Sequence, residues 1–411
     1  MAQTTEAKSV QASSEAAGQI TTLTTVGSAT SQVLMSGALS QVWGLINGLQ
    51  LFVHIPLFQL SLPANAQTLV DQLITIATFD LVEPEVVFGW MLEFPEEDEN
   101  ALDPSFTESG YESAYMINLL GMGFIVFIAI LLVILCILLL HPLRKHSRGL
   151  SQRLDTVSGS IFWGFWLRFL IEDSLIALIA VFCDQYSIQA NSDSDSQIQP
   201  SNPATAFKLV DISILILFGL ALFALPFFVV VFYLINFEKL TDKNFMGRYG
   251  EVYAGLNPER KSTIAFSVFF LLRRYIFAIT ICLTLFWQVW FQIATQLVLS
   301  MGSACFLLNF TPFEDALPLD LEIFNEVTTI MLLYHVTCFT EFIPSALTHV
   351  LIGYSFLALM LGNMAVHLFF LSRSSIKGCM YKYRKRRHLQ ASVSKIETRG
   401  AQRAKEKNMN D

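Results

Sequence analysis

Long runs of apolar residues dominate the chain and predict helices that cross a membrane. The strongest run, Ala114–Leu140, contains no charged residue. Seven further runs are of similar character: Val26–Leu60, Ile161–Phe182, Phe207–Asn236, Ala265–Trp287, Trp290–Asn309, Leu321–Phe339 and Leu347–Leu371. A helix needs about 20 mostly apolar residues to span the hydrocarbon core of a bilayer. The sequence therefore predicts an all-α polytopic bundle of about eight spans.

One segment has a different pattern. Residues Asn65–Leu81 alternate with helical periodicity between an apolar and a polar face. The apolar face holds Leu69, Leu73, Ile76 and Phe79, and the polar face holds Asp71, Gln72 and Thr75. Such a segment is typical of an amphipathic helix lying at the membrane interface rather than crossing it.

Composition supports the membrane class. Hydrophobic residues make up 53% of the 411 residues and charged residues only 15%, against about 25% charged residues in soluble domains. The six cysteines form no CxxC pair and lie mostly in apolar runs, so neither a disulfide scaffold nor a zinc site is indicated. Nucleotide-binding and hydrolase motifs are also missing. The sequence predicts no enzyme, no cofactor, no metal site and no nucleic-acid partner.

Charge is distributed unevenly. The segment Arg373–Asp411 contains 12 basic and three acidic residues, and is therefore +9, whereas the rest of the chain is −17. Three regions follow from this distribution and from polarity. Residues 1–22 are polar and expected to be disordered, residues 23–372 form the membrane domain, and residues 373–411 form a basic tail.

Basic and acidic connections predict the orientation of the spans. The connections His141–Arg153 and Phe237–Lys261 and the tail are basic, and the positive-inside rule places them in the cytoplasm. The acidic connections Asp80–Ser113 and Asp184–Ala206 contain no Lys or Arg and are expected on the outer side. The host membrane is the plasma membrane or an endomembrane, and the side of the N-terminus stays open.

Several ionisable residues fall inside the predicted spans, where each needs a partner or a hydrated cavity. Arg168 and Glu172 are four residues apart, so they can pair on one helix face. The remaining members of this candidate intramembrane network are Asp173, Asp211, Arg273, Arg274 and Glu326. One of the two adjacent arginines is expected to meet one of the three carboxylates. The network is either a salt-bridge cluster that locks the bundle or part of an ion pathway.

Two further sets of polar residues have helical spacing. Gln288, Gln292 and Gln296 recur every four residues, and Ser300 and Ser303 extend the stripe. Such a stripe either bonds a neighbouring helix or lines a hydrated path.

The carboxylates Glu322 and Glu326 share a face with Asn325. They can hold a cation, or they can stabilise a helix N-terminus through the helix dipole. We favour the second role for this pair.

The basic tail predicts a membrane-lipid partner. Its densest part contains Lys382, Arg384, Lys385, Arg386 and Arg387. Cations directly after a span are attracted to the anionic inner leaflet, although ordinary positive-inside anchoring explains them equally well. Cys379, between the last span and these cations, is a candidate palmitoylation site.

Four segments resemble the membrane module of TRP-like proteins, a group that includes fungal TRP-like, flavin-carrier and polycystin-related proteins and large protist surface proteins. The segments are Trp43–Pro63, Thr78–Glu85, Arg248–Ser262 with the following Phe269–Ala278, and Phe310–Glu326. The resemblance implies a multi-spanning protein that acts as a cation channel or channel subunit. The alternative is a non-conducting membrane subunit that anchors a surface-recognition or structural complex. Both hypotheses imply a homo- or hetero-oligomer.

Overall fold

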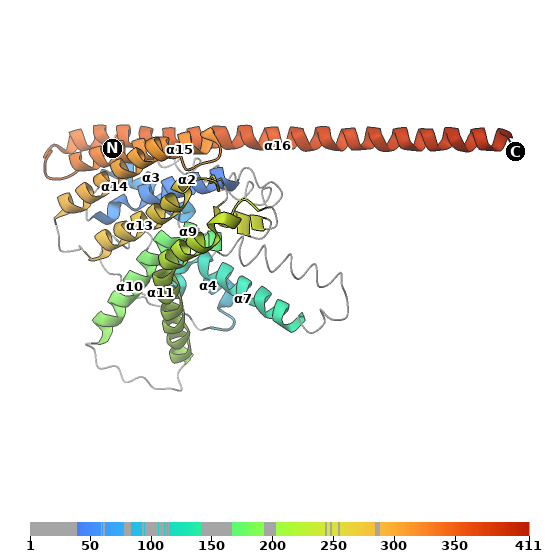
Figure 1. The fold of residues 1–411 in the computed structure, drawn as a ribbon. Coiled ribbons are helices and arrows are strands. Elements are labelled where there is room, and N and C mark those ends of the chain that lie inside the picture. The colour runs from blue at the N-terminus through green and yellow to red at the C-terminus, as the bar shows by residue number, and fades with distance from the viewer. Residues whose placement is uncertain are drawn as a thin grey trace, which may run out of the picture.

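A computed structural model describes most of the chain after residue 38. The described residues are 39–58, 60, 62–77, 84–92, 94, 106, 111, 113, 115–140, 167–192, 203–242, 245–246, 249–253, 255–283 and 288–410. These residues form an all-α structure (Figure 1). The backbone bridge between Leu256 and Phe313 is the one β-type pairing in this part of the chain. The predicted polar region 1–22 lies outside the described residues.

The long helices are α7 (Met122–Leu140), α11 (Pro203–Asn236), α13 (Ser262–Leu283), α14 (Val289–Phe310), α15 (Ala316–Cys338) and α16 (Ala346–Asn410). The shorter ones are α2 (Leu39–Val53), α3 (Ala64–Ala77), α4 (Pro84–Phe88), α6 (Met116–Leu120), α9 (Leu167–Glu172) and α10 (Ser174–Ser192). The described residues also form three 3₁₀ turns: η1 (Ile55–Phe58), η4 (Phe237–Lys239) and η5 (Gly250–Tyr253).

Five helical segments of the described residues are long and apolar enough to cross a membrane. They are Gly123–Leu140, Phe207–Lys239, Ser262–Cys282, Val289–Phe310 and Ala346–Lys377. All five overlap predicted spans, but the predicted number of about eight is not shown. The helix α2 is described only from Leu39, a break at Asp173 divides α9 from α10, and α15 carries three carboxylates in its first three turns.

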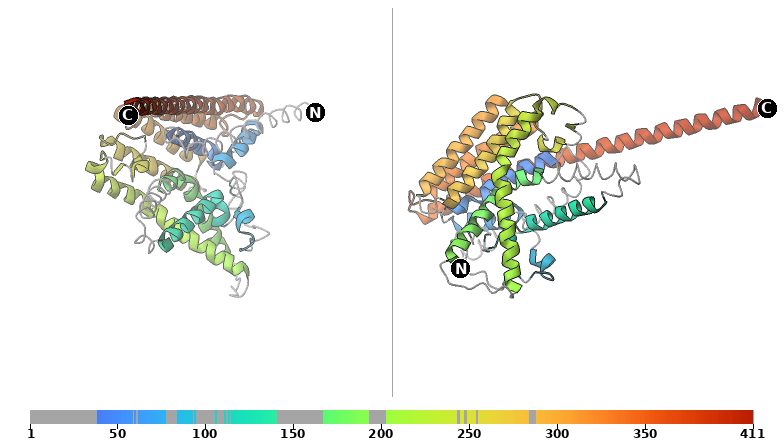
Figure 2. Two further views of the ribbon diagram at one scale, coloured as in Figure 1. Left: turned by 90° about the vertical axis from the view of Figure 1, so that its right-hand side faces the viewer. Right: turned by 60° about the horizontal axis from the view of Figure 1, so that its bottom comes forward.

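The helices α14, α15 and α16 pack side by side, and α2 and α3 pack against this group (Figure 1). On the other side of α2 lie α13, α10 and α11, with α6 packed on α10 and α11 (Figure 2). The helix α7 packs on α4 and α6 and, through Phe127, on Phe218 of α11 (ring centres 5.0 Å apart), and it exposes leucines along its C-terminal half. The core therefore sits among α2, α10, α13 and α15.

The end of the connection that precedes α13 and the turn between α14 and α15 pack on one another. Asn257 N–H donates to the Pro312 carbonyl (2.9 Å), and Glu314 N–H donates to the Gly255 carbonyl (3.1 Å). The tail of α16 leaves the bundle at this same end, because α15 and α16 run antiparallel (Figure 2). The described part of this basic connection and the basic tail thus lie at one end of the bundle, whereas the third basic connection, His141–Arg153, lies outside the described residues. That this end of the bundle is cytoplasmic stays a prediction.

The helix α16 continues without a break through the predicted domain boundary at residues 372 and 373. Its C-terminal part extends well past the other helices (Figure 1), and residues 378–410 follow its membrane-length segment Ala346–Lys377. At 1.5 Å per residue, this part is about 50 Å long. The membrane segment and the basic tail are therefore one element of secondary structure.

The predicted interfacial helix corresponds to α3, which packs between α2 and α16. Its buried residues are Ala66, Leu69, Val70, Leu73, Ile74 and Ala77, and Asp71 is exposed. The amphipathic pattern is thus present, and its apolar face is covered by helices of this chain.

A close approach between α3 and α16 depends on Gly353. Asn65 Nδ2 donates to the Val350 carbonyl (3.1 Å), and a Cβ placed on Gly353 would lie 2.5 Å from Asn65 Oδ1. We expect Gly353→Ala to displace Asn65 and to cost about 1–3 kcal/mol of unfolding free energy. Equilibrium unfolding in mixed micelles measures this cost.

The matched control is Gly362→Ala on the same helix, where an added Cβ meets no atom within 4 Å. This change is expected to leave stability unchanged or slightly raise it, since Ala favours helix more than Gly. In an Asn65→Ala background the cost of Gly353→Ala should largely disappear. An equal cost in both backgrounds would contradict the proposed clash.

Candidate functional site: a buried polar cluster

A helix break exposes backbone carbonyls in the interior of the bundle. The break lies at Asp173, between α9 and α10. Ser174 Oγ donates to the Ile171 carbonyl (2.8 Å), which satisfies one of these groups. Arg168 Nε lies 2.7 Å from Glu172 Oε1, as the four-residue spacing predicts. Broken helices inside membrane bundles occur where the freed backbone lines protein or a cavity.

Arg274 binds a second backbone carbonyl that the helix break leaves free. Its Nη1 donates to the Glu172 carbonyl (2.5 Å), and its Nη2 donates to Asn47 Oδ1 (2.5 Å). The guanidinium carbon also lies 4.5 Å from the ring centre of Phe270, a cation–π distance. No ion pair within 4 Å joins Arg274 to Asp173, although both are described and buried. The arginine is therefore held by a carbonyl, an amide and a ring.

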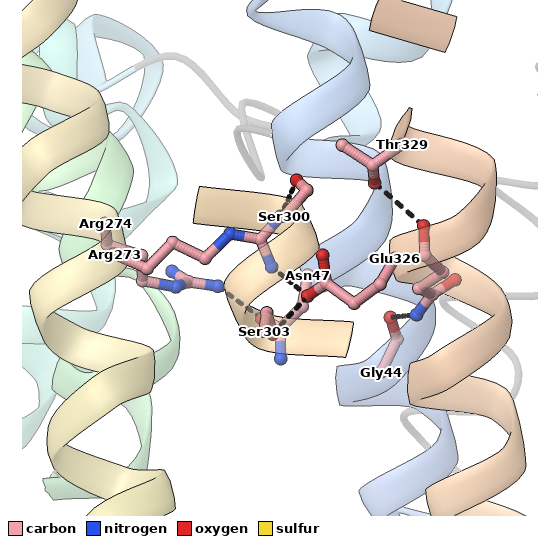
Figure 3. A network of polar contacts seen from close by, with 9 residues as sticks. Gly44, Asn47, Arg273, Arg274, Ser300, Ser303, Glu326 and Thr329 are labelled. Carbon is pink, nitrogen blue, oxygen red and sulfur yellow. Dashed lines mark hydrogen bonds and ion pairs between the residues drawn. The ribbon is translucent and has the colours of Figure 1, made fainter. Parts of the chain in front are cut away.

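The adjacent Arg273 has a carboxylate partner (Figure 3). Its Nη1 contacts Glu326 Oε1, and its Nη2 donates to Ser300 Oγ (2.9 Å). Ser303 Oγ donates to the same Glu326 oxygen (2.8 Å). Of the three carboxylates expected as partners, Glu326 is the one that pairs. This contact joins α13, α14 and α15 through buried side chains, which strengthens electrostatic interactions relative to water.

Asn325 connects α15 to two further helices. Its Nδ2 donates to the Gly44 carbonyl of α2 (3.1 Å; Figure 3). Its Oδ1 accepts from Asn363 Nδ2 (3.0 Å) and from His367 Nε2 (2.7 Å), both on α16. The tautomer follows, since an amide oxygen only accepts. Asn325 is thus the junction of α2, α15 and α16.

The structure places Glu322 and Glu326 in the second and third turns of α15, which begins at Ala316. The favoured helix-capping role is therefore wrong for both. The predicted start at Leu321 is late because Pro318 falls in the first turn, where proline is tolerated.

Small residues allow α2 to approach α15 closely. A Cβ on Gly48 would lie 3.1 Å from Asn325 Oδ1, and one on Gly44 would lie 3.4 Å from Glu322 Oε1. The two glycines are four residues apart, the GxxxG spacing that is common at close helix contacts in membranes.

Two cavities adjoin the cluster. The larger, of about 70 Å³, lies among α2, α9, α11, α13, α15 and α16 and is also lined by Val252 and Leu256 of the connection before α13. The smaller, of about 30 Å³, lies beside Arg273, Arg274 and Glu326. Both are lined by Glu322 and Asn47. One water needs about 10–15 Å³ of such space, so the larger cavity can hold several waters.

The glutamine stripe faces the interior only in part. Gln292 and Gln296 are buried on α14, whereas Gln288 precedes the helix and is exposed. Ser300 and Ser303 continue the buried stripe and contact the cluster through Arg273 and Glu326. The stripe therefore supports helix packing at its cluster end, and neither cavity includes the three glutamines.

Asp211 takes no part in these contacts. Its Oδ1 accepts from the Ile117 N–H (2.9 Å) at the start of α6. In the tail, Arg384 is exposed on α16. The side chains of the other predicted tail residues lie outside the described ones: Cys379, Lys382, Lys385, Arg386 and Arg387.

Tyr253 holds together the connection between α11 and α13, which lines part of the larger cavity. Its hydroxyl donates to the Leu240 carbonyl (2.9 Å), and the neighbouring Val252 lines the cavity. Burial raises the pKa of the Tyr253 hydroxyl, so it stays protonated as a donor.

Sequence reasoning did not place Asn47 or Asn363 in the site, and for the cavity-lining carboxylate Glu322 it favoured a helix-capping role over the cation-binding one. Asn47 and Asn363 each lie within an apolar helix, and such isolated polar residues are the available signal. Among the described residues, no group of three His, Cys, Asp or Glu side chains is arranged to hold a metal ion.

The fold and the buried cluster define a helical integral membrane protein. No family model, curated protein or solved structure matches the chain. The comparisons therefore assign no family, and the resemblance to TRP-like proteins gains no support from them.

Proposed function

We propose that the chain is a cation channel or a channel subunit, with an organisation similar to that of TRP-like membrane proteins. The observation that carries this proposal is the meeting of three carboxylates, Glu172, Glu322 and Glu326, at cavities inside a bundle of apolar helices. Carboxylates at membrane depth are costly and are typical of cation pathways. The proposal includes a homo- or hetero-oligomer, in which the assembled subunits together form the path for the cation.

Two details support a cation rather than an anion. The described cluster contains three arginines and four carboxylates, since Asp173 joins the three glutamates. In addition, Glu172 Oε2 and Glu326 Oε2 are buried and have no hydrogen-bond partner in the structure. The excess of carboxyl over guanidinium groups and the unused acceptor atoms favour an incoming positive charge.

Recording from purified protein in planar lipid bilayers tests the proposal. We expect a cation-selective current whose reversal potential follows the cation gradient, and a reduced conductance for Glu322→Gln. The matched control Asp320→Asn removes an exposed carboxylate from the same helix and should leave the current unchanged. Folded protein that carries no current under any voltage or cation gradient would rule out conduction by this chain alone.

A non-conducting membrane subunit is the second candidate. It is favoured by the long projecting part of α16, which offers a docking helix, and by the small size of the cavities. In this role the basic tail lies in the cytoplasm against anionic lipid, and the bundle anchors a larger complex. Native mass spectrometry in mild detergent separates the candidates, since a homo-oligomer favours a channel and a fixed heteromeric partner favours the subunit.

A further inference from the structure

The larger cavity combines carboxylates with aromatic walls. Glu172 and Glu322 line it together with Phe266, Phe270 and Tyr233. Phe266 packs edge-on against Phe313, which also lines the cavity, with ring centres 5.1 Å apart. Negative groups beside aromatic faces are the usual setting for organic ammonium ligands.

The cavity also contains buried polar atoms without protein partners. Glu172 is 4% exposed, and its Oε2 has no hydrogen-bond partner. His367 is 2% exposed, and its Nδ1 has no hydrogen-bond partner either. The other ring nitrogen, Nε2, donates to Asn325 Oδ1. In this tautomer Nδ1 has a lone pair and acts only as an acceptor. Unpaired buried acceptors are costly unless a donor satisfies them, and water or the hydroxyl group of a small amino alcohol can do so here, whereas a quaternary ammonium group itself has no N–H to donate.

The residues that line the cavity include one more carboxyl group than guanidinium group. Arg168 is the one arginine that lines it, and this side chain already pairs with Glu172 Oε1 (2.7 Å). Glu322 forms no ion pair within 4 Å with a described residue. A Cβ on Gly44 would lie 3.4 Å from Glu322 Oε1 and 4.0 Å from His367 Cε1, so both groups reach the same part of the cavity.

An organic cation fits these surroundings better than a bare metal ion does. The described residues provide no group of three metal-ligating side chains. An ammonium group needs no such shell, since aromatic faces attract it at up to about 6 Å. The molecule already contains one example of this contact, the Arg274 guanidinium 4.5 Å from the Phe270 ring centre.

We propose that this cavity binds a small organic ammonium group of the size of choline, with Glu322 as its counter-ion and Phe266 and Tyr233 as its aromatic walls. The ammonium comes either from a free amine or from a lipid headgroup that enters at the membrane edge. The site does not depend on conduction by the chain, because it requires only the folded bundle.

Binding of tritiated choline to purified protein in phosphatidylglycerol nanodiscs tests the proposal. We expect saturable binding of one choline per chain. NaCl added at the same ionic strength as the choline should not displace it. Glu322→Gln is expected to weaken binding on the order of tenfold or more. Asp320→Asn, an exposed carboxylate on the same helix, should bind as the unaltered chain does.

Nanodiscs of phosphatidylcholine distinguish the two sources. If the lipid headgroup occupies the cavity, free choline binds in phosphatidylglycerol but not in phosphatidylcholine. If the ligand is a free amine, choline binds equally in both. Either result supports the site, whereas the absence of saturable choline binding in phosphatidylglycerol overturns it.

A second variant guards against misfolding of Glu322→Gln. Phe266→Leu keeps an apolar side chain but removes one aromatic face, and it is expected to weaken choline binding several-fold. Equal displacement of choline by NaCl, or unchanged binding in both variants, would also overturn the proposal. The failure of channel recordings would leave this result intact, because binding is measured without current.

Discussion

Replacing Arg273 by Met is expected to lower the free energy of unfolding by about 3–5 kcal/mol. The change removes the ion pair with Glu326 and the hydrogen bond to Ser300 (2.9 Å). It leaves Glu326 buried at 3% exposure without its cationic partner, while the hydrogen bond from Ser303 remains. An isolated carboxylate in such a place destabilises the fold. Equilibrium unfolding in micelles with increasing SDS measures the effect.

The double variant Arg273→Met, Glu326→Met separates the pair from the packing around it. Because both charges are removed together, most of the stability is expected to return. Arg373→Met is the matched control, since this arginine is exposed on α16. If the double variant were as unstable as Arg273→Met alone, the unpaired carboxylate would not be the cause.

Asn325→Leu is expected to cost about 3 kcal/mol, because it removes the hydrogen bonds of Asn325 to three groups on two helices, of which Asn363 keeps its bond to Thr328 Oγ1 (3.3 Å). These groups are the Gly44 carbonyl, the Asn363 amide and the His367 Nε2–H. The loss should loosen α16 from α15 before the whole bundle unfolds. Hydrogen exchange in α16 measures this local change alongside SDS unfolding.

Thr337→Val is the control for Asn325→Leu on the same helix. The Thr337 hydroxyl bonds only within α15, to the Tyr334 carbonyl (2.7 Å), so its loss should have little effect. Unchanged exchange in α16 of the Asn325→Leu variant would show that this junction does not hold the helices together.

Apolar run length predicted the long helices well, because a bilayer span requires the same local property everywhere. The five segments that qualify as spans lie where the sequence placed them. The first predicted span and the one that α9 and α10 replace were harder. These segments contain polar residues such as Asn47, which makes a tertiary contact, and Asp173, which lies at a helix break. The hydrophobic periodicity of the sequence indicates neither feature.

Local spacing predicted part of the cluster. The Arg168–Glu172 pair needs only one helix, and its spacing was sufficient. Arg274 instead meets Asn47, 227 residues earlier in the chain, and a carbonyl freed by a helix break. Neither partner has a sequence signal that marks it. The cavity at Glu322 requires the packing of six helices and could not be predicted from one of them.

The unbroken course of α16 joins the basic tail mechanically to the centre of the bundle. Asn363 and His367, which bond Asn325, lie on the same rigid rod as the tail. Adjacent residues of an α-helix are about 100° apart around its axis. Twisting the tail by that angle would turn both side chains away from Asn325. A protein or membrane surface that rotates the tail therefore also rotates Asn363 and His367 relative to Asn325, because one unbroken helix joins them.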